Sequence, residues 1–143
     1  EGSIAQMAAL AVLMPMVANQ AGNTGQQALA VMIRQLATES FDARRSWGAV
    51  VRESKIGLGT GLVMALIAYI GVLLLSGNSL LAFVMGVSLL LDMFLGAIAG
   101  GAIPLVLRAL GRDPAQASSI FLTALTDSGG FFIFLGLATV FLF

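Results

Sequence analysis

Long hydrophobic stretches with at most one charged residue each alternate with short polar connections along this chain. Four stretches are long enough to cross about 30 Å of hydrocarbon, for which a helix needs about 20 residues. They cover residues 2–33, 56–75, 80–107 and 117–143. Because a chain inside a bilayer must satisfy its backbone hydrogen bonds internally, the pattern predicts an all-α, polytopic membrane bundle with four transmembrane helices.

The connections between these stretches differ in character. Ser76-Gly77-Asn78-Ser79 is short, uncharged and typical of a turn. The longer connection, residues 38–55, interleaves aromatic and aliphatic residues such as Trp47 with arginines. Two interpretations of it stay open: a short amphipathic helix on the inner leaflet, or a solvated loop that carries the charges which set the topology.

Composition places the chain in a lipid bilayer and narrows its chemistry. Hydrophobic residues make up 59% and charged residues 10%, the mean hydropathy is +1.00, and soluble domains are typically about 25% charged. Cysteine and histidine are both absent, which excludes disulfides, thiolate or imidazole metal sites and Ser-His triads. Any bound metal is therefore expected to be a hard cation held by oxygen.

No pattern indicates an enzyme or a nucleic-acid-binding protein. The glycines Gly57, Gly59 and Gly61 invite comparison with a nucleotide-binding loop, but no strand precedes them and no Lys-Ser/Thr follows. The spacings Gly57-x-x-x-Gly61 and Gly96-x-x-x-Gly100 instead predict close helix packing.

The basic residues predict an orientation in the cell membrane. All seven lie at two junctions: Arg34, Arg44, Arg45, Arg52 and Lys55 at the first, and Arg108 and Arg112 at the last. The positive-inside rule places both junctions in the cytoplasm and the C-terminus outside. The start, Glu1-Gly2-Ser3, has neither an initiator Met nor a basic leader, so we expect the chain to be part of a longer protein.

Asp127 is the residue that most directly indicates a function. It is the sole charged residue of the run 117–143, and an ionised Asp at the centre of a spanning helix costs roughly 2.5–3.5 kcal/mol. Ser119 and Thr123 precede it at intervals of four and Gly130 follows, so all four share one helix face. The stripe predicts a cation site, although Ser and Thr also commonly bond to carbonyls of their own helix.

The first span carries a dense polar cluster around two glycines. Amides at membrane depth must face a bundle interior or water, so the cluster indicates either pore lining or interhelical hydrogen bonds. The glycines allow backbone carbonyls to face a pore or another helix to approach closely. The cluster comprises Asn19, Gln20, Gly22, Asn23, Thr24, Gly25, Gln26 and Gln27.

Two further acids need an explanation. Asp92 lies near the middle of the third span, where it either joins an ion path or is protonated and hydrogen-bonded to a neighbouring amide. Glu53 lies between Arg52 and Lys55, and a local salt bridge accounts for it.

Several short motifs, in order along nearly the whole chain, resemble the transmembrane domain of the MgtE-type magnesium channels and transporters. The chain departs from the family pattern at Ser119, where Asn is frequent, and at Asp92, which falls in a part of the third span where Asn or Ala is frequent. The matching motifs are Pro15 followed by G-N-T-G-Q-Q at 22–27, Arg34-x-Leu36-Ala37, Glu53, Gly86-Val87-Ser88-Leu89, Pro104, Asp113-Pro114-Ala115, Ser118-Ser119 and Thr126-Asp127.

This resemblance implies an assembly that the spacing alone does not reveal. It implies a homodimer of five-helix subunits, so that one helix and the soluble regulatory domains precede residue 1. The pore is expected on the two-fold axis, lined by the first and last helices of this chain, with Asp127 helping to hold a hydrated Mg²⁺. Cytosolic Mg²⁺-sensing domains are expected to gate it.

The sequence thus predicts a divalent cation pathway through the bilayer, with Mg²⁺ as cargo and ligand. Two other classes stay open: a proton- or Na⁺-coupled transporter module that uses Asp127 and Asp92, and a purely structural assembly subunit. The predicted ligands of the ion or of its hydration shell are Asp127, Asn23, Gln26, Thr123, Gly130, Ser119 and Gly22.

Overall fold

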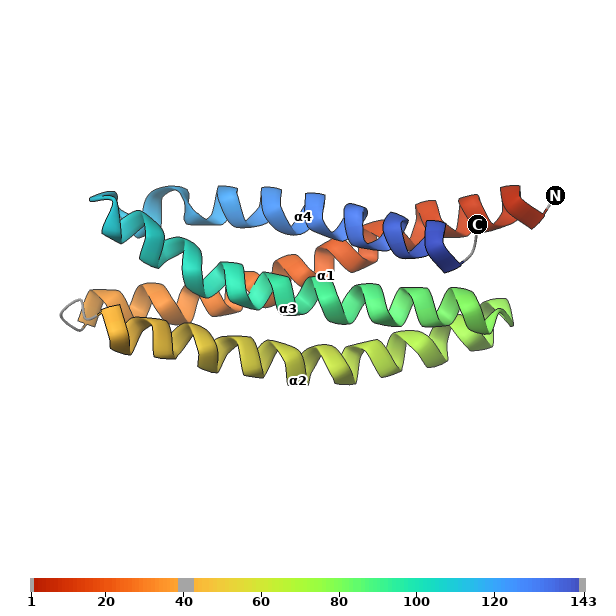
Figure 1. Ribbon diagram of the computed structural model, residues 1–143, viewed down its shortest axis with the longest axis horizontal. Helices are drawn as coiled ribbons and strands as arrows, with labels where there is room; N and C mark the ends of the chain where they lie inside the picture. Colours follow the sequence, from red (N-terminus) through yellow and green to blue (C-terminus); the bar gives the residue numbers. More distant parts are fainter. Residues whose placement is uncertain (1, 39–42, 142–143) are drawn as a thin grey trace.

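The computed structural model describes residues 2–38 and 43–141, and within these ranges the chain folds into four α-helices. They are α1 (Gly2–Thr38), α2 (Ala43–Ser76), α3 (Ser79–Ala109) and α4 (Pro114–Phe141) (Figure 1). The predicted all-α fold class is confirmed.

The connection predicted over 38–55 takes a form that the sequence did not indicate. From Ala43 onward it is helical and continuous with α2, so its described part is neither a separate interfacial helix nor a loop. Residues 39–42 lie outside the described part of the chain. Trp47 is exposed on this extension, at the end where α2 leaves the apolar region.

α3 is the central helix of the bundle. It packs against α1, α2 and α4, and α1 also packs against α4, whereas α1 and α2 barely touch. In Figure 1, α2 and α4 flank α3 on opposite sides and α1 passes obliquely behind it. This central position matches its sequence, since α3 buries residues on most of its circumference.

The turn predicted at 76–79 is confirmed, and its residues explain it. Gly77 adopts a φ of +69°, which glycine tolerates without strain. Asn78 then caps α3, because its Oδ1 accepts hydrogen bonds from the backbone N–H groups of Leu80 and Leu81 at 3.1 Å. At the other end of α3, Gly111 has a φ of +78° and the Arg112 N–H donates to the Leu107 carbonyl.

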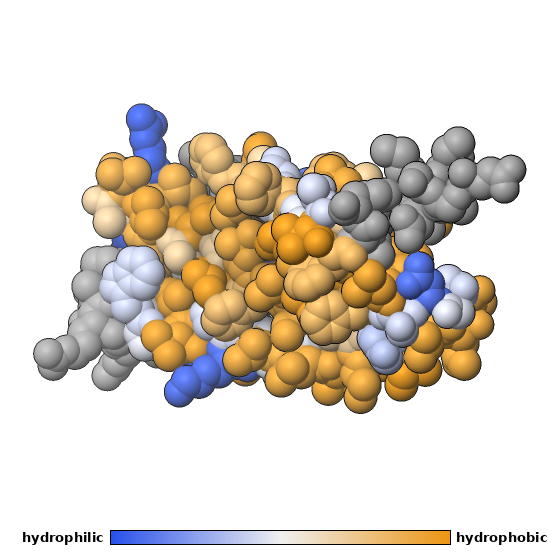
Figure 2. All heavy atoms as spheres, turned by 45° about the vertical axis from the view of Figure 1, so that its right-hand side comes forward, coloured by the Kyte–Doolittle hydropathy of each residue, from blue (hydrophilic) through white to orange (hydrophobic). Residues whose placement is uncertain are grey.

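Three helices are long and apolar enough to cross a membrane within the described residues: Trp47–Ser76, Ser79–Ala109 and Ser118–Phe141. α1, with 37 residues, is also long enough to cross a membrane. The face shown in Figure 2 is largely apolar, as expected of a surface in contact with lipid. Both basic junctions, α1–α2 and α3–α4, lie at the same end of the bundle (Figure 1).

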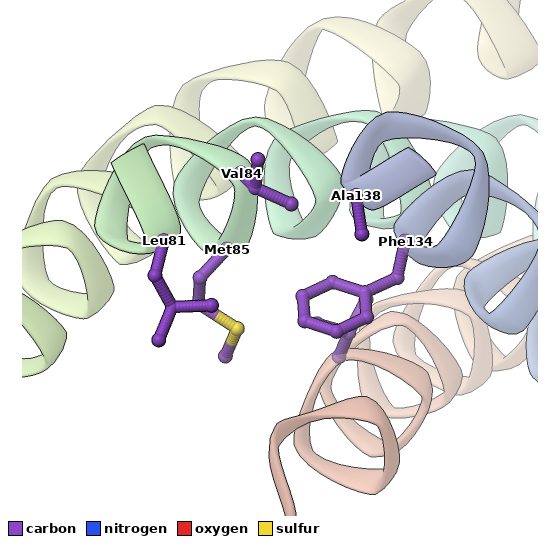
Figure 3. Packing of buried hydrophobic residues seen from close by; sticks show 6 residues of the cluster. Leu81, Val84, Met85, Phe134 and Ala138 are labelled. Carbon is purple, nitrogen blue, oxygen red and sulfur yellow. The ribbon is translucent and has the colours of Figure 1, made fainter. Parts of the chain in front are cut away.

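Apolar side chains fill the bundle in separate clusters. Val17, Val84, Met85 and Phe134 belong to one cluster, in which the Phe134 ring faces the α3 side chains (Figure 3). A second cluster, nearer the basic junctions, joins Met32 and Leu36 to α2 and α3, and a third is formed by Leu29, Ala99 and Leu122. Asp92 lies on α3 between the first and the third clusters.

Glycines set the separation between helices at two crossings. A β-carbon at Gly100 would collide with the Gly25 carbonyl oxygen of α1, and one at Gly57 would collide with the Ala97 β-carbon of α3. A β-carbon at Gly96 would likewise collide with the Ala21 carbonyl oxygen of α1, and one at Gly61 would lie 3.1 Å from Leu90 of α3. The predicted close packing through both glycine pairs is therefore confirmed.

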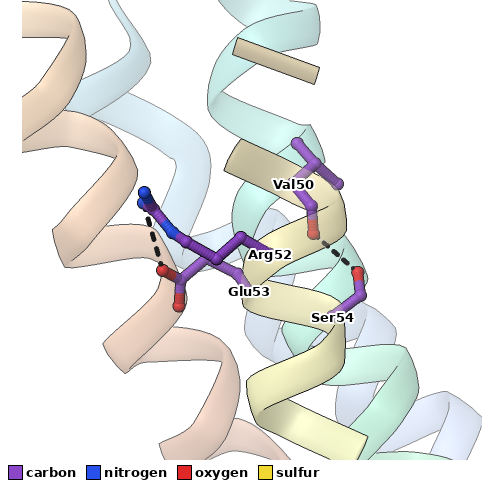
Figure 4. Close-up of polar contacts among 4 residues, drawn as sticks. All are labelled: Val50, Arg52, Glu53 and Ser54. Atoms are coloured by element: carbon purple, nitrogen blue, oxygen red, sulfur yellow. Dashed lines mark hydrogen bonds and ion pairs between the residues drawn. The ribbon is translucent and has the colours of Figure 1, made fainter. Parts of the chain in front are cut away.

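The salt bridge predicted for Glu53 is also confirmed. An Arg52 Nη atom lies 3.5 Å from Glu53 Oε1 (Figure 4). Glu53 is buried at 8% exposure although Arg52 is open to solvent. On the same turn the Ser54 hydroxyl donates to the Val50 carbonyl at 2.7 Å.

Candidate cation-binding site

A polar seam joins α1 to α4. The Gln26 side-chain amide donates to Ser119 Oγ at 2.9 Å and lies 3.4 Å from Thr123 Oγ1. Ser119 and Thr123 are one turn apart on α4, so a single amide of α1 reaches both. The structure therefore brings together three of the predicted ligands, and both hydroxyls serve as interhelical acceptors.

Asp127 continues this seam and opens onto a groove between α1 and α4. The groove has a volume of about 540 Å³ and is lined by Asp127, Asn19 and neighbouring apolar residues. Six waters around an octahedral Mg²⁺ occupy roughly 180 Å³ at about 30 Å³ each, which is less than the volume of the groove. The remaining lining residues are Pro15, Met16, Ala18 and Phe131.

The predicted ligands differ in exposure. Asn23, Ser119 and Thr123 are exposed on the outer face of the α1–α4 pair, and Asp127 is half-buried beside them. Gly22 is half-buried, and a β-carbon there would lie 3.8 Å from Thr126 Oγ1. Gly130 is buried, and a β-carbon there would meet Asp92 of α3 and Ala18 of α1.

One polar groove residue is absent from the predicted ligand set. Asn19 lines the groove beside Asp127, and the signal for it was in the sequence, because it precedes Asn23 by one turn and so shares its helix face. The buried Thr126 hydroxyl, by contrast, bonds to the Leu122 carbonyl at 3.0 Å, which is the local role that hydroxyls in helices commonly have.

Asp92 and Ser88 form a second polar position deep in the bundle. Both side chains are 0% exposed. Within the described residues, neither the Ser88 hydroxyl nor either Asp92 carboxyl oxygen has a hydrogen-bond partner. One interpretation of Asp92 was a hydrogen bond to a neighbouring amide, and the described structure contains no such bond.

The acidic groups of the site are few and spread out. No three acidic side chains converge anywhere in the part of the chain that the structure describes. Asp92 nevertheless approaches the turn of α4 that follows Asp127, because a β-carbon at Gly130 would collide with Asp92 Oδ2. A site with few carboxylates and many amides and hydroxyls suits a cation that keeps its water shell, as Mg²⁺ does.

Comparison with known proteins points to one family. Residues 14–137 match the sequence profile of the MgtE family, described as a divalent cation transporter. The chain is 38% identical over 142 residues to a magnesium transporter MgtE of Bacillus subtilis and 35% identical over 142 residues to one of Thermus thermophilus. These alignments cover 99% of this chain but only 32% and 31% of the two relatives, so the chain spans about a third of their length.

Proposed function

We propose that this chain, which belongs to the MgtE family of divalent cation transporters, forms the membrane pathway through which Mg²⁺ crosses a bilayer. The named function of the relatives supports Mg²⁺ as the cargo, and so does the oxygen-only chemistry of a chain without cysteine or histidine.

One observation carries the proposal: a polar stripe runs along the outer face of a membrane bundle. Asn23, Ser119, Thr123 and Asp127 all lie on the surface shared by α1 and α4. Polar groups at this depth are not stable against lipid tails. They need water or a second protein surface that is equally polar.

A second copy of the chain meets this need. In a two-fold dimer the stripe of each copy faces the other, and the two Asp127 carboxylates approach the axis. Two like charges in a low-dielectric environment repel each other, and a divalent cation on the axis neutralises both. We therefore place the pore on that axis, with α1 and α4 of both copies as its walls.

The remaining side chains act on the water shell of the ion. Mg²⁺ loses its waters reluctantly and keeps several of them when bound. The amides of Asn23 and Gln26 and the hydroxyls of Ser119 and Thr123 are suited to bind those waters. Outer-shell binding is weak enough to release the ion, which conduction requires.

The orientation and the missing parts follow from the same proposal. Both basic junctions lie at one end of the bundle (Figure 1), and we place that end in the cytoplasm. The relatives are about three times longer than this chain. We place a further membrane helix and Mg²⁺-sensing cytosolic domains in the remainder.

The test is Mg²⁺ flux into proteoliposomes that contain the full-length protein. Asp127→Asn is expected to abolish most of the flux, while Asp113→Asn, a matched change at an exposed loop carboxylate, leaves it intact. Near-normal flux in Asp127→Asn overturns the proposal. Flux that follows an imposed pH or Na⁺ gradient identifies the coupled-transporter class instead, and absence of flux in the parent protein identifies a structural subunit.

A further inference from the structure

Asp92 of α3 is a buried acid for which the pathway described above has no role. Its side chain is 0% exposed, and both carboxyl oxygens are without a hydrogen-bond partner in the described structure. Ser88, one turn earlier on the same helix face, is equally buried and its hydroxyl is also unpartnered. Burying polar oxygens without partners is unfavourable, which makes this position a candidate site for a ligand.

The Asp92 carboxyl points at the turn of α4 that follows Asp127. A β-carbon at Gly130 would collide with Asp92 Oδ2, and one at Gly129 would lie 3.5 Å from Oδ1. Gly130 follows Asp127 by three residues, so the two positions are neighbours on α4, with about 5–6 Å between β-carbons. Asp92 Oδ2 thus occupies the place of the side chain that Gly130 lacks.

Gly130, against which the Asp92 carboxyl packs, also packs against a residue that lines the groove of Asp127. Ala18 of α1 lines that groove, and its Cα lies 3.3 Å from the position of a β-carbon at Gly130. Because Gly130 has no side chain, α4 presents only its backbone to the Asp92 carboxyl at this position.

We propose that Asp92 and Asp127 of one subunit form a carboxylate pair that binds a single divalent cation. The Ser88 hydroxyl is positioned one turn away to bind a water of its shell. This inference rests on the function proposed above, in which Asp127 binds the ion near the dimer axis. It adds Asp92 of the same chain as a second acidic ligand. Two carboxylates displace more of the water shell than one, so the pair holds the ion more tightly than Asp127 alone.

Mg²⁺ titration of the full-length protein, followed by thermal unfolding in detergent, tests the pair. Asp92→Asn and Asp127→Asn are each expected to weaken the apparent Mg²⁺ affinity about tenfold or more. The double variant is expected to be no weaker than the weaker single variant, because both changes remove the same bound ion. Without Mg²⁺, Asp92→Asn is expected to unfold at or above the parent temperature, since the repulsion between the two acids is gone.

A glycine substitution tests the geometry without touching either acid. Gly130→Ala places a methyl group where Asp92 Oδ2 lies and is expected to weaken Mg²⁺ affinity as Asp92→Asn does. Gly136→Ala is the matched control on the same helix, because a β-carbon there meets no atom within 4 Å. If Asp92→Asn does not fold, the comparison of Gly130→Ala with Gly136→Ala still tests the proposal.

The outcomes separate the two proposals. One outcome is that Asp92→Asn and Gly130→Ala both bind Mg²⁺ as tightly as the parent protein while Asp127→Asn binds it more weakly. This result overturns the carboxylate pair and leaves the proposed function intact. Parental affinity in Asp127→Asn overturns the pair as well, and parental flux in the same variant overturns the proposed function.

Discussion

The side-chain amide of Gln26 donates to Ser119 Oγ at 2.9 Å and thereby ties α1 to α4 across 93 positions of the sequence. The same nitrogen lies 3.4 Å from Thr123 Oγ1. Hydroxyls in membrane helices often bond only to their own backbone, but here two of them are acceptors for a neighbouring helix. The bond fixes the relative position of the two helices that carry the polar stripe.

Gln26→Leu, which keeps the side-chain size and removes the amide, is expected to destabilise the bundle modestly. In a double-mutant cycle with Ser119→Ala we expect a coupling free energy of about 0.6 kcal/mol, the average for interhelical hydrogen bonds in membranes. The measurement is the free energy of unfolding in mixed micelles. Thr139→Ala is the control, since that hydroxyl bonds to the Leu135 carbonyl of its own helix. Equal coupling of Gln26 to Ser119 and to Thr139 would contradict the assignment.

Two glycines on α2 are expected to respond in opposite ways to the same substitution. Gly57→Ala places a methyl group against the Ala97 β-carbon of α3 and is expected to cost about 1–3 kcal/mol through overpacking. Gly59→Ala meets no atom within 4 Å and is expected to stabilise the helix by up to about 1 kcal/mol. Thermal unfolding of both variants in one detergent is the measurement, and similar unfolding temperatures would show that α2 and α3 do not pack through Gly57.

The fold was predictable to the extent that local chemistry decides it. Gly77 and Asn78 specify a turn and a helix cap whatever surrounds them, and the spacing of Gly57 and Gly61 specifies a face for a neighbouring helix. The start of α2 was not predictable in this way. Residues from Ala43 to Lys55 are mixed in polarity, and their helical state depends on Ala49 and Val50 packing against α1 and α3.

The site was predictable where it lies along one helix and not where helices meet. Ser119, Thr123 and Asp127 share a face by spacing alone, and Asn19 follows from the same rule applied to α1. The contact of Asp92 with Gly130 has no local signal, because it depends on how α3 rotates against α4. For the same reason the sequence suggested that Gly130 extends the polar stripe, whereas the structure places it against Asp92 and Ala18.

Single cysteines provide a test of the dimer-axis pore. This chain contains no cysteine, so a cysteine introduced in a background free of other cysteines reacts alone. Ser119→Cys on the polar stripe is expected to form an intersubunit disulfide under mild oxidation, since the bond needs Cα atoms within about 7 Å. Leu66→Cys on the exposed apolar face of α2 is expected to remain monomeric on a non-reducing gel. Cross-linking through Leu66 but not through Ser119 would place the two-fold axis at α2 and remove α1 and α4 from the pore.

Cysteine labelling also tests the proposed orientation. Ser79 and Arg112 are both exposed and lie at opposite ends of the long central helix, just before and just after its apolar region. If the basic junctions face the cytoplasm, a membrane-impermeant maleimide added to intact cells is expected to label Ser79→Cys and to reach Arg112→Cys only after permeabilisation. The reverse pattern would place the arginines outside and would invert the direction from which an ion meets Asp127. Because a helix in the bilayer has its two ends on opposite sides, labelling of both variants in intact cells would show that α3 does not span the membrane, and the pore proposal would fail with it.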